Sequence, residues 1–217
     1  MNVFIVGIAG RTGSRVAELL AQRGDTVHGL YRLPEQANGL QAIGATGTLG
    51  DVATISEQRL ASAASGADVI VFAAGAGPHD SDAMVDAVDG DGILKAIAAA
   101  RILGISRMFL VSVFPEAGRD GHFGDGFEHY MSAKKRADVA LVHSGLDWLI
   151  LRPSTLTDDP GTGRVSLTPA EMHVNISRDD LAATIAALLH SPDLRRRIFE
   201  VTAGATMIPE ALTALLP

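Results

Sequence analysis

Tyr130 and Lys134 stand four residues apart in this chain, in the order Tyr-Met-Ser-Ala-Lys. On an α-helix that spacing places both side chains on one face. An ammonium beside a phenol favours the phenolate, so we expect Lys134 to lower the pKa of Tyr130 into a range useful for proton transfer. Ser112 closes an apolar run and can orient a substrate carbonyl. Because Tyr-x-x-x-Lys is a common pattern, the alternative is a surface pair on an amphipathic helix.

Three glycines follow the first apolar run, Val3–Val6, at positions Gly7, Gly10 and Gly13. Apolar residues then recur at helical spacing over 16–20. The free amides and the dipole of a helix N-terminus favour an anion. Gly7 permits a tight turn, Gly10 lets a pyrophosphate approach the backbone, and Gly13 allows close packing of helix on strand. The pattern predicts a dinucleotide site, the alternative being an ordinary strand–helix turn.

The second predicted strand ends in Tyr31 and Arg32. An acidic residue at this point would bind the ribose 2′-hydroxyl of NAD and repel a 2′-phosphate. A guanidinium can instead clamp the 2′-phosphate of NADP. Arg11, inside the glycine turn, can reach the same phosphate. These residues favour NADP over NAD, the alternative for Arg32 being a solvated surface charge.

Other expected cofactor contacts follow later strands. Asp51 can accept a hydrogen bond from the adenine amino group, or can cap the following helix. Small residues at 73–75 let adenosine lie against the backbone, and Lys134 can hold the nicotinamide ribose. The complete set of expected contacts is Gly7, Ala9, Gly10, Arg11, Thr12, Gly13, Tyr31, Arg32, Gly50, Asp51, Val52, Ala73, Ala74, Gly75, Ser112, Lys134, Pro153, Ser154 and Thr155.

Apolar strand-like runs alternate with helical periodicity along the chain. This order predicts a doubly wound parallel sheet covered by helices on both faces, a three-layer α/β/α Rossmann fold. We expect a single domain over residues 1–217. The predicted strands are 3–6, 26–31, 45–49, 68–73, 107–112, 147–151 and 198–202. The predicted helices are the one after Gly13, then 34–43, 55–64, 84–103, 127–143 and 178–190.

Two segments interrupt this alternation. Residues 113–126 are rich in glycine and charge, and residues 152–176 are rich in proline and threonine. Both follow strands, at the edge where doubly wound folds bind ligands, so we expect loops that wall the substrate pocket. The alternative is two surface loops without a role. Gly92, inside the predicted helix 84–103, indicates either close packing near the cofactor or a kink.

Carboxylates and imidazoles are concentrated in the first of these segments and at the start of the next helix. Such side chains suit several divalent metals. No metal-ligand spacing stands out, so we predict no metal site, and His129 is an alternative substrate contact. The residues concerned are Asp120, His122, Asp125, Glu128 and His129.

Composition narrows the class of protein. The chain has 217 residues, enough for one well-buried domain. It contains no cysteine, which excludes disulfides and thiolate chemistry and favours a cytoplasmic location. No apolar run reaches the ~20 residues of a membrane span, and the net charge of −7 argues against nucleic-acid binding. The expected partner is a small-molecule substrate, bound by a monomer or homodimer.

Seven motifs together resemble a known family: residues 6–13, 30–32, 50–52, 109–112, 130–135, 144–153 and 176–182. The chain resembles an atypical short-chain dehydrogenase/reductase, and more closely the small NAD(P)H-binding proteins of the NmrA-like and biliverdin reductase B-like group. The resemblance implies a Rossmann core, a bound dinucleotide and catalytic roles for Ser112, Tyr130 and Lys134. In the small relatives this triad is often incomplete, and some members are redox sensors. Val113 departs from relatives that carry a second serine.

These features predict an NADP-dependent oxidoreductase that passes hydride between NADPH and a small carbonyl or quinone-like substrate. Tyr130 is expected to transfer the proton, Lys134 to tune it and Ser112 to orient the substrate. A non-catalytic NADP(H)-binding sensor and an NAD(P)-dependent epimerase/dehydratase are the alternatives.

Overall fold

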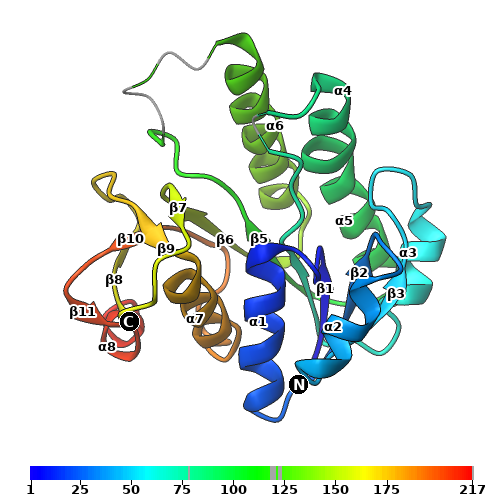
Figure 1. The fold of residues 1–217 in the computed structure, drawn as a ribbon, viewed down its shortest axis with the longest axis horizontal. Helices are drawn as coiled ribbons and strands as arrows, with labels where there is room; N and C mark the ends of the chain where they lie inside the picture. Colours follow the sequence, from blue (N-terminus) through cyan, green and yellow to red (C-terminus); the bar gives the residue numbers. More distant parts are fainter. Residues whose placement is uncertain (78, 118–120, 122–123, 217) are drawn as a thin grey trace.

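A nine-stranded sheet runs through the computed structural model of this protein, which describes residues 1–77, 79–117, 121 and 124–216 (Figure 1). Its strand order is β11-β8-β10-β6-β5-β4-β1-β2-β3. The strands are β1 (Asn2–Val6), β2 (Thr26–Tyr31), β3 (Thr46–Leu49), β4 (Val69–Phe72), β5 (Arg107–Val111), β6 (Asp147–Pro153), β8 (Arg164–Thr168), β10 (Arg197–Ala203) and β11 (Thr206–Met207). A separate parallel pair joins β7 (Leu156–Thr157) to β9 (Ile176–Ser177).

Helices connect most of these strands. They are α1 (Arg11–Gln22), α2 (Gln36–Ala42), α3 (Glu57–Ala63), α4 (Asp82–Val85), the π-helical turn η1 (Asp86–Gly90), α5 (Asp91–Leu103), α6 (Asp125–Val142), α7 (Arg178–Leu189) and α8 (Ile208–Thr213). Within the described part of the chain, no helix combines the length and the apolar character needed to cross a membrane.

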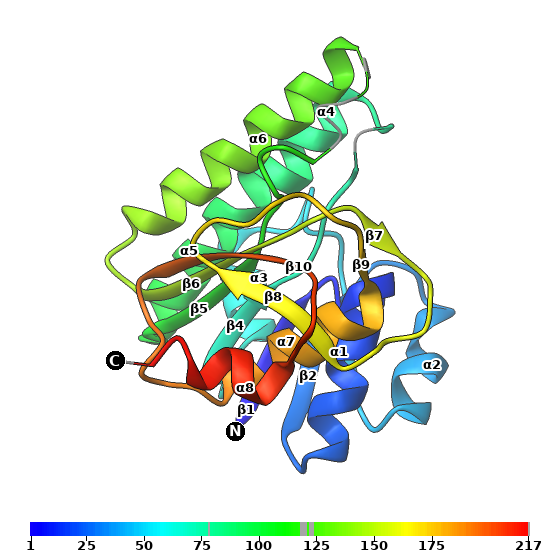
Figure 2. The same cartoon turned by 90° about the vertical axis from the view of Figure 1, so that its left-hand side faces the viewer.

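Alternate residues of each strand point to opposite faces of the sheet and build two cores. In β1, Val3 and Ile5 belong to the core that includes residues of α1 and α7, whereas Phe4 and Val6 belong to the core beneath α3 and α5. Figure 2 shows α5 and α6 on one side of the strands and α7 and α8 on the other. The predicted three-layer α/β/α arrangement is confirmed.

The strand order reverses at β1, which pairs with β2 on one side and β4 on the other. In doubly wound sheets a crevice opens outside the carboxyl ends of the strands at such a point. The first turn of α1 therefore lies at the edge of the sheet where ligands of this fold class bind.

The predicted helix 84–103 is interrupted. The chain forms α4, then the π-helical turn η1, then α5. A Cβ added at Gly92 would lie 3.0 Å from Cζ of Phe72 and 3.2 Å from Cγ2 of Val52. Close packing therefore explains this glycine, because a larger residue would push α5 away from β4 and from the turn after β3.

The segment 152–176 was expected to be a loop, and this was wrong in part. It contains the end of β6, the strands β7 and β8 and the start of β9. Strand β8 runs antiparallel to β10 and to β11, so one edge of the otherwise parallel sheet is antiparallel. Only Val165 and Leu167 of β8 are buried. Two apolar residues between threonines and glycines are a weak strand signal, and pairing with distant β10 decides the outcome.

Candidate functional site

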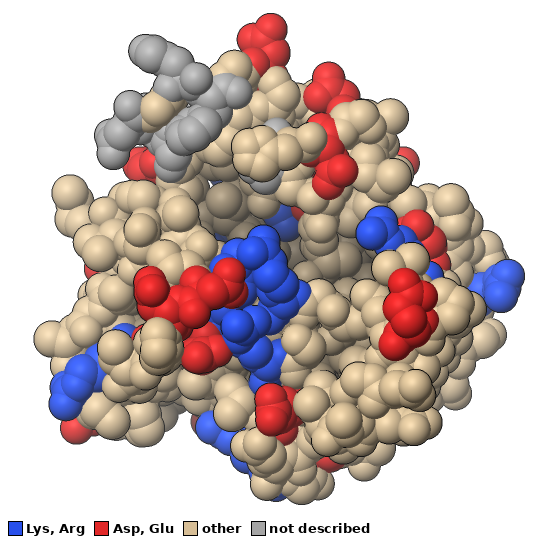
Figure 3. Space-filling view, viewed as in Figure 1, with Lys and Arg blue, Asp and Glu red and all other residues tan. Residues whose placement is uncertain are grey.

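A cleft of about 570 Å³ follows the carboxyl edge of the sheet. Figure 3 shows this face hollowed near its middle, with lysine and arginine side chains at the border of the hollow and a group of acidic side chains beside them. Among the predicted site residues, those that line the cleft are Gly7, Ala9, Gly10, Arg11, Thr12, Tyr31, Arg32, Gly50, Asp51, Val52, Ala73, Ala74, Gly75, Ser112, Tyr130, Lys134 and Pro153.

The glycines between β1 and α1 are fixed by close backbone contacts. Gly7 has a φ of +87°, and a Cβ there would lie 2.8 Å from the backbone nitrogen of Ala74 at the end of β4. A Cβ at Gly13 would lie 2.2 Å from the carbonyl oxygen of Gly7. Gly13 therefore does not line the cleft but lets α1 pack against the turn, as predicted. The amide of Gly10 donates to the same Gly7 oxygen at 3.0 Å.

The N-terminus of α1 has no side-chain cap. Its N-cap residue is Gly10, and its first turn contains no acidic residue. The amides of Arg11, Thr12 and Gly13 fall in the first turn, where a helix has no intrahelical partner to offer them. An anion in the cleft can accept these hydrogen bonds and interact with the positive end of the helix dipole.

The end of β2 forms another part of the cleft. Gln36 of α2 accepts hydrogen bonds from the backbone amides of Arg32 and Leu33, at 3.1 and 2.9 Å. This contact holds the backbone turn while the Arg32 side chain stays exposed. A planar guanidinium in this position has the geometry to clamp a phosphate.

The turn after β3 is held from two sides. Asp51 accepts from the amide of Ala53 at 2.9 Å, and Lys95 of α5 donates to the carbonyl oxygens of Val52 and Ala53 at 2.9 and 2.7 Å. Asp51 thus closes its own turn, whereas Ser56 caps α3. The interpretation of Asp51 as the cap of that helix was wrong, and the role of Lys95 carried no signal in the sequence.

Lys134 is buried beneath the cleft against a carboxylate that was not among the predicted site residues. Its Nζ lies 2.9 Å from Oδ1 of Asp89 in η1, and both side chains are almost inaccessible. The second oxygen of Asp89 accepts from the amide of Ala76 at 2.9 Å, and Lys134 also donates to the carbonyl of Val111 at 3.4 Å. Nζ lies 5.8 Å from the ring centroid of Tyr130. The lysine therefore links η1, β5 and α6 under the cleft.

The expectation that Lys134 lowers the pKa of Tyr130 into the neutral range was wrong. Burial raises the pKa of the Tyr130 phenol, Lys134 lowers it and Asp89 raises it again, so that the pKa lies above the ordinary phenol value. Burial by itself would lower the pKa of Lys134, but its interactions with Tyr130, Asp89 and Asp138 outweigh burial and raise that pKa. At neutral pH the phenol is protonated and the lysine is charged.

Asp89 could have been found from helical spacing. It lies four residues after Val85 and four before Ile93, and both of these are buried. A carboxylate at a position that the 3.6-residue period assigns to the apolar face must find a buried partner. Asp89 is only 1% exposed, and that partner is Lys134.

The predicted serines differ in their surroundings. The hydroxyl of Ser112 is buried, has no hydrogen-bond partner among the described residues and borders the cleft. The hydroxyl of Ser154 is likewise buried and without a described partner, but it does not line the cleft. Thr155 bonds His173 at 3.1 Å, and His173 stands edge-on to Phe114. Of these predicted contacts, Ser112 has the position and the free hydroxyl to bind a ligand.

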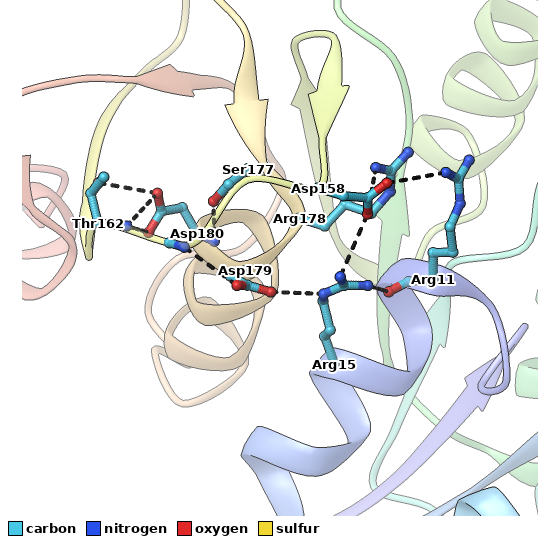
Figure 4. Close-up of polar contacts among 9 residues, drawn as sticks. Arg11, Arg15, Asp158, Thr162, Ser177, Arg178, Asp179 and Asp180 are labelled. Carbon is cyan, nitrogen blue, oxygen red and sulfur yellow. Dashed lines mark hydrogen bonds and ion pairs between the residues drawn. The ribbon is translucent and has the colours of Figure 1, made fainter.

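Arg11 makes an ion pair across the mouth of the cleft. Its guanidinium lies 3.4 Å from Asp158, in the segment after β7. Arg15 of α1 and Arg178 of α7 also contact Asp158, at 3.5 and 2.9 Å, and Arg15 further pairs with Asp179 at 2.7 Å (Figure 4). Three guanidinium groups from two helices thus converge on one carboxylate.

Part of the predicted pocket loop 113–126, including Asp120 and His122, lies outside the described residues. His129 of α6 has its Nε2 3.1 Å from Asp86 of η1, a contact that joins the two helices. In the described ranges, no group of three or more histidine, aspartate or glutamate side chains is placed to hold a metal ion.

Known proteins resemble this chain in sequence and in structure. Residues 7–192 match a family described as NAD(P)H-binding. YhfK of Bacillus subtilis, named an uncharacterized sugar epimerase, is 38% identical over 216 residues, which are 99% of this chain and 100% of YhfK. A Bacillus halodurans structure provisionally assigned as an NAD-dependent epimerase/dehydratase has a TM-score of 0.88 and 30% identity over 99% of both chains. The oxidoreductase ylbE from Lactococcus lactis has a TM-score of 0.84 and 27% identity, covering 99% of this chain and 96% of its own.

Proposed function

The chain belongs to the NAD(P)H-binding family, and we propose that it is an NADP-dependent oxidoreductase that reduces a small carbonyl or quinone-like substrate. The observation that carries this proposal is a convergence of features on one cleft. The uncapped start of α1 lies at that cleft, and Ser112, Tyr130 and Lys134 also line it. One ligand can therefore contact the glycine turn and the three polar side chains together.

The described residues fit a dinucleotide. Gly7 and Gly13 leave no room for a side chain, and the first turn of α1 borders the cleft and carries no acidic residue of its own. Arg32 at the end of β2 supports NADP, because a guanidinium matches a 2′-phosphate and β2 ends without a carboxylate. Ser112 adds a buried hydroxyl that finds no partner in the described part of the chain, which is costly unless a ligand or water satisfies it.

The proton step follows from the protonation states. When bound, NADPH supplies the hydride, two electrons and one proton, that forms the new C–H bond at the carbonyl carbon. The Tyr130 phenol, protonated at neutral pH, donates its proton to the carbonyl oxygen and is then reprotonated from solvent. Ser112 holds that oxygen by hydrogen bonding, and the Lys134 ammonium stabilises the transient phenolate. The products are an alcohol and NADP⁺.

An epimerase or dehydratase is the second candidate, supported by the names of YhfK and of the Bacillus halodurans protein. Such an enzyme would convert its substrate without net consumption of the nucleotide. A non-catalytic sensor would bind NADPH without any turnover. Stoichiometry separates the three functions, because only the oxidoreductase oxidises one NADPH for each carbonyl reduced.

The first test is NADPH oxidation with a panel of small aldehydes, ketones and quinones. For a carbonyl substrate we expect Tyr130→Phe to lower kcat by about 100-fold or more, because general acid catalysis is lost. The dissociation constant of NADPH, measured by calorimetry, should stay close to that of the wild type. NADPH binding without turnover by the wild-type protein would reject the oxidoreductase and favour the sensor.

The second test is the pH profile. Reduction needs the protonated phenol, and the raised pKa of Tyr130 keeps it protonated as pH rises through neutrality. Carbonyl reduction should therefore remain independent of this group until pH exceeds the ordinary phenol value of about 10. Asp89→Asn removes a charge that raises this pKa, so the fall in rate should move to lower pH. An unchanged profile in that variant would contradict the assignment of Tyr130 as the acid.

A further inference from the structure

We infer that Arg178, together with Arg11, binds the diphosphate of the dinucleotide, and that Asp158 competes with this diphosphate for both guanidinium groups. The inference rests on the proposed nucleotide function and adds a second helix to the site. The sequence pattern predicts the diphosphate at the N-terminus of α1 alone and Arg11 near the 2′-phosphate, so the role at the diphosphate is new for both arginines. Figure 4 shows Arg178, at the start of α7, and Arg11, at the start of α1, directed to the same carboxylate.

Arg178 is unusual because it is charged, buried and turned to the cleft. It is 8% exposed and lines the cleft with Arg11 and Thr12. A guanidinium carries five N–H donors. Among the described residues Arg178 pairs only with Asp158, through Nη1. Burial of a guanidinium is costly unless its donors are bound, so the remaining donors call for an acceptor inside the cleft.

The position of Arg178 in its helix adds to this cost. It is the first residue of α7, where the helix dipole disfavours a cation. The two carboxylates of the same turn are engaged elsewhere. Asp179 pairs with Arg15, and Asp180 accepts from the amides of Thr162 and Gly163. A helix of this kind gains from an external anion beside its first residue.

The geometry favours the diphosphate over other anions. Arg178 and Arg11 share the cleft with the open amides of α1, which already select for a phosphate group. Two arginines and a helix N-terminus then surround one anion. Asp158 is half-exposed, and its contact with Arg11 is long at 3.4 Å, so Arg11 can exchange this partner at little cost.

The test compares three variants by calorimetry with NADPH and with ADP-ribose, which keeps the diphosphate but lacks both the nicotinamide and the 2′-phosphate. Arg178→Gln should weaken both ligands by about 10-fold or more, because charge-assisted hydrogen bonds are lost. Arg15→Gln is the matched control. It also removes an arginine from Asp158 but does not line the cleft, so both affinities should stay near wild type. Asp158→Asn should tighten both ligands by roughly threefold, because a like charge leaves the site.

Four results would contradict the binding of the diphosphate by Arg178 or its competition with Asp158. Unchanged NADPH affinity in Arg178→Gln would do so, as would a loss confined to NADPH with ADP-ribose unaffected. A raised KM for the carbonyl substrate at constant NADPH affinity would assign Arg178 to a substrate anion instead. If Arg178→Gln fails to fold, Asp158→Asn decides, because weaker or unchanged binding there contradicts competition. Failure of the wild-type protein to bind either nucleotide would reject the proposed function itself.

Discussion

The N-termini of α1 and α7 belong to neighbouring helices in one layer, yet they satisfy their backbone amides in opposite ways. The first turn of α7 is closed by its own residues: Ser177 accepts from the amide of Asp180 at 3.0 Å, and two carboxylates follow. The first turn of α1 begins at Gly10 and carries neither a cap nor an acidic residue. The cap of α7 satisfies a backbone amide without a ligand, whereas the first amides of α1 are left to receive one.

The two helix starts also differ in the neighbouring segments that they fix. Asp180 of α7 binds the amides of Thr162 and Gly163 and the Thr162 hydroxyl, so it fixes the segment before β8. At the start of α1, Gly7 and Gly13 fix the backbone by close contacts, and no side chain of the described residues caps the helix. The backbone at the start of α7 is therefore occupied, and that helix offers the cleft a side chain, Arg178, whereas the start of α1 offers its backbone amides.

The strongest way to break this comparison is Gly13→Ala. The new Cβ would lie 2.2 Å from the Gly7 carbonyl oxygen, so the backbone of the turn must move. We expect a loss of about 3 kcal/mol in the free energy of unfolding by urea, together with loss of NADPH binding. The control is Gly39→Ala in α2, where a Cβ meets nothing within 4 Å and a gain of up to ~1 kcal/mol is expected. Equal stabilities of the two variants would refute the close contact.

A second substitution gives the N-terminus of α1 a side-chain cap and a carboxylate, two features that the N-terminus of α7 has. Gly10→Asp would place a carboxylate at the N-cap, which stabilises the helix but repels a diphosphate. NADPH binding should weaken by about 100-fold, because like charges about 4 Å apart near a protein surface repel by about 4 kcal/mol before salt screening. Gly10→Ala adds the same Cβ, 3.2 Å from the Gly7 oxygen, without charge, and should weaken binding less. If both variants bind NADPH equally, charge at this helix start is irrelevant.

The smallest effect is expected when the side-chain cap at the N-terminus of α7 is removed. Ser177→Ala removes the cap and is expected to cost about 1 kcal/mol in the free energy of unfolding, with NADPH affinity retained. Ser56→Ala, which removes the equivalent cap of α3, gives a matched reference. A fall in NADPH affinity at unchanged stability in Ser177→Ala would show that the start of α7 serves the ligand through its cap as well.

The site was predictable where its chemistry is local. The glycine turn follows from a strand and a helix that must meet closely, and Tyr130 and Lys134 share a face because they are one helical turn apart. The partners of these residues were not predictable in the same way. Asp89 reaches Lys134 only after η1 packs on α6, and Arg11 meets Asp158 across 147 residues. Burial of the phenol, together with the charge of Asp89, then raised the pKa of Tyr130 where Lys134 was expected to lower it.

Hydrophobic periodicity and backbone sterics act over short distances, so the order of residues was enough to predict the alternation of strands and helices, the glycine turn and the strand ends that form the cleft. The antiparallel edge at β8, the buried Lys134–Asp89 pair and the meeting of Arg11 and Arg178 at Asp158 became visible in the folded molecule. All of these features depend on which distant segments meet, and for the Lys134–Asp89 pair the cost of burying charge selects the partner.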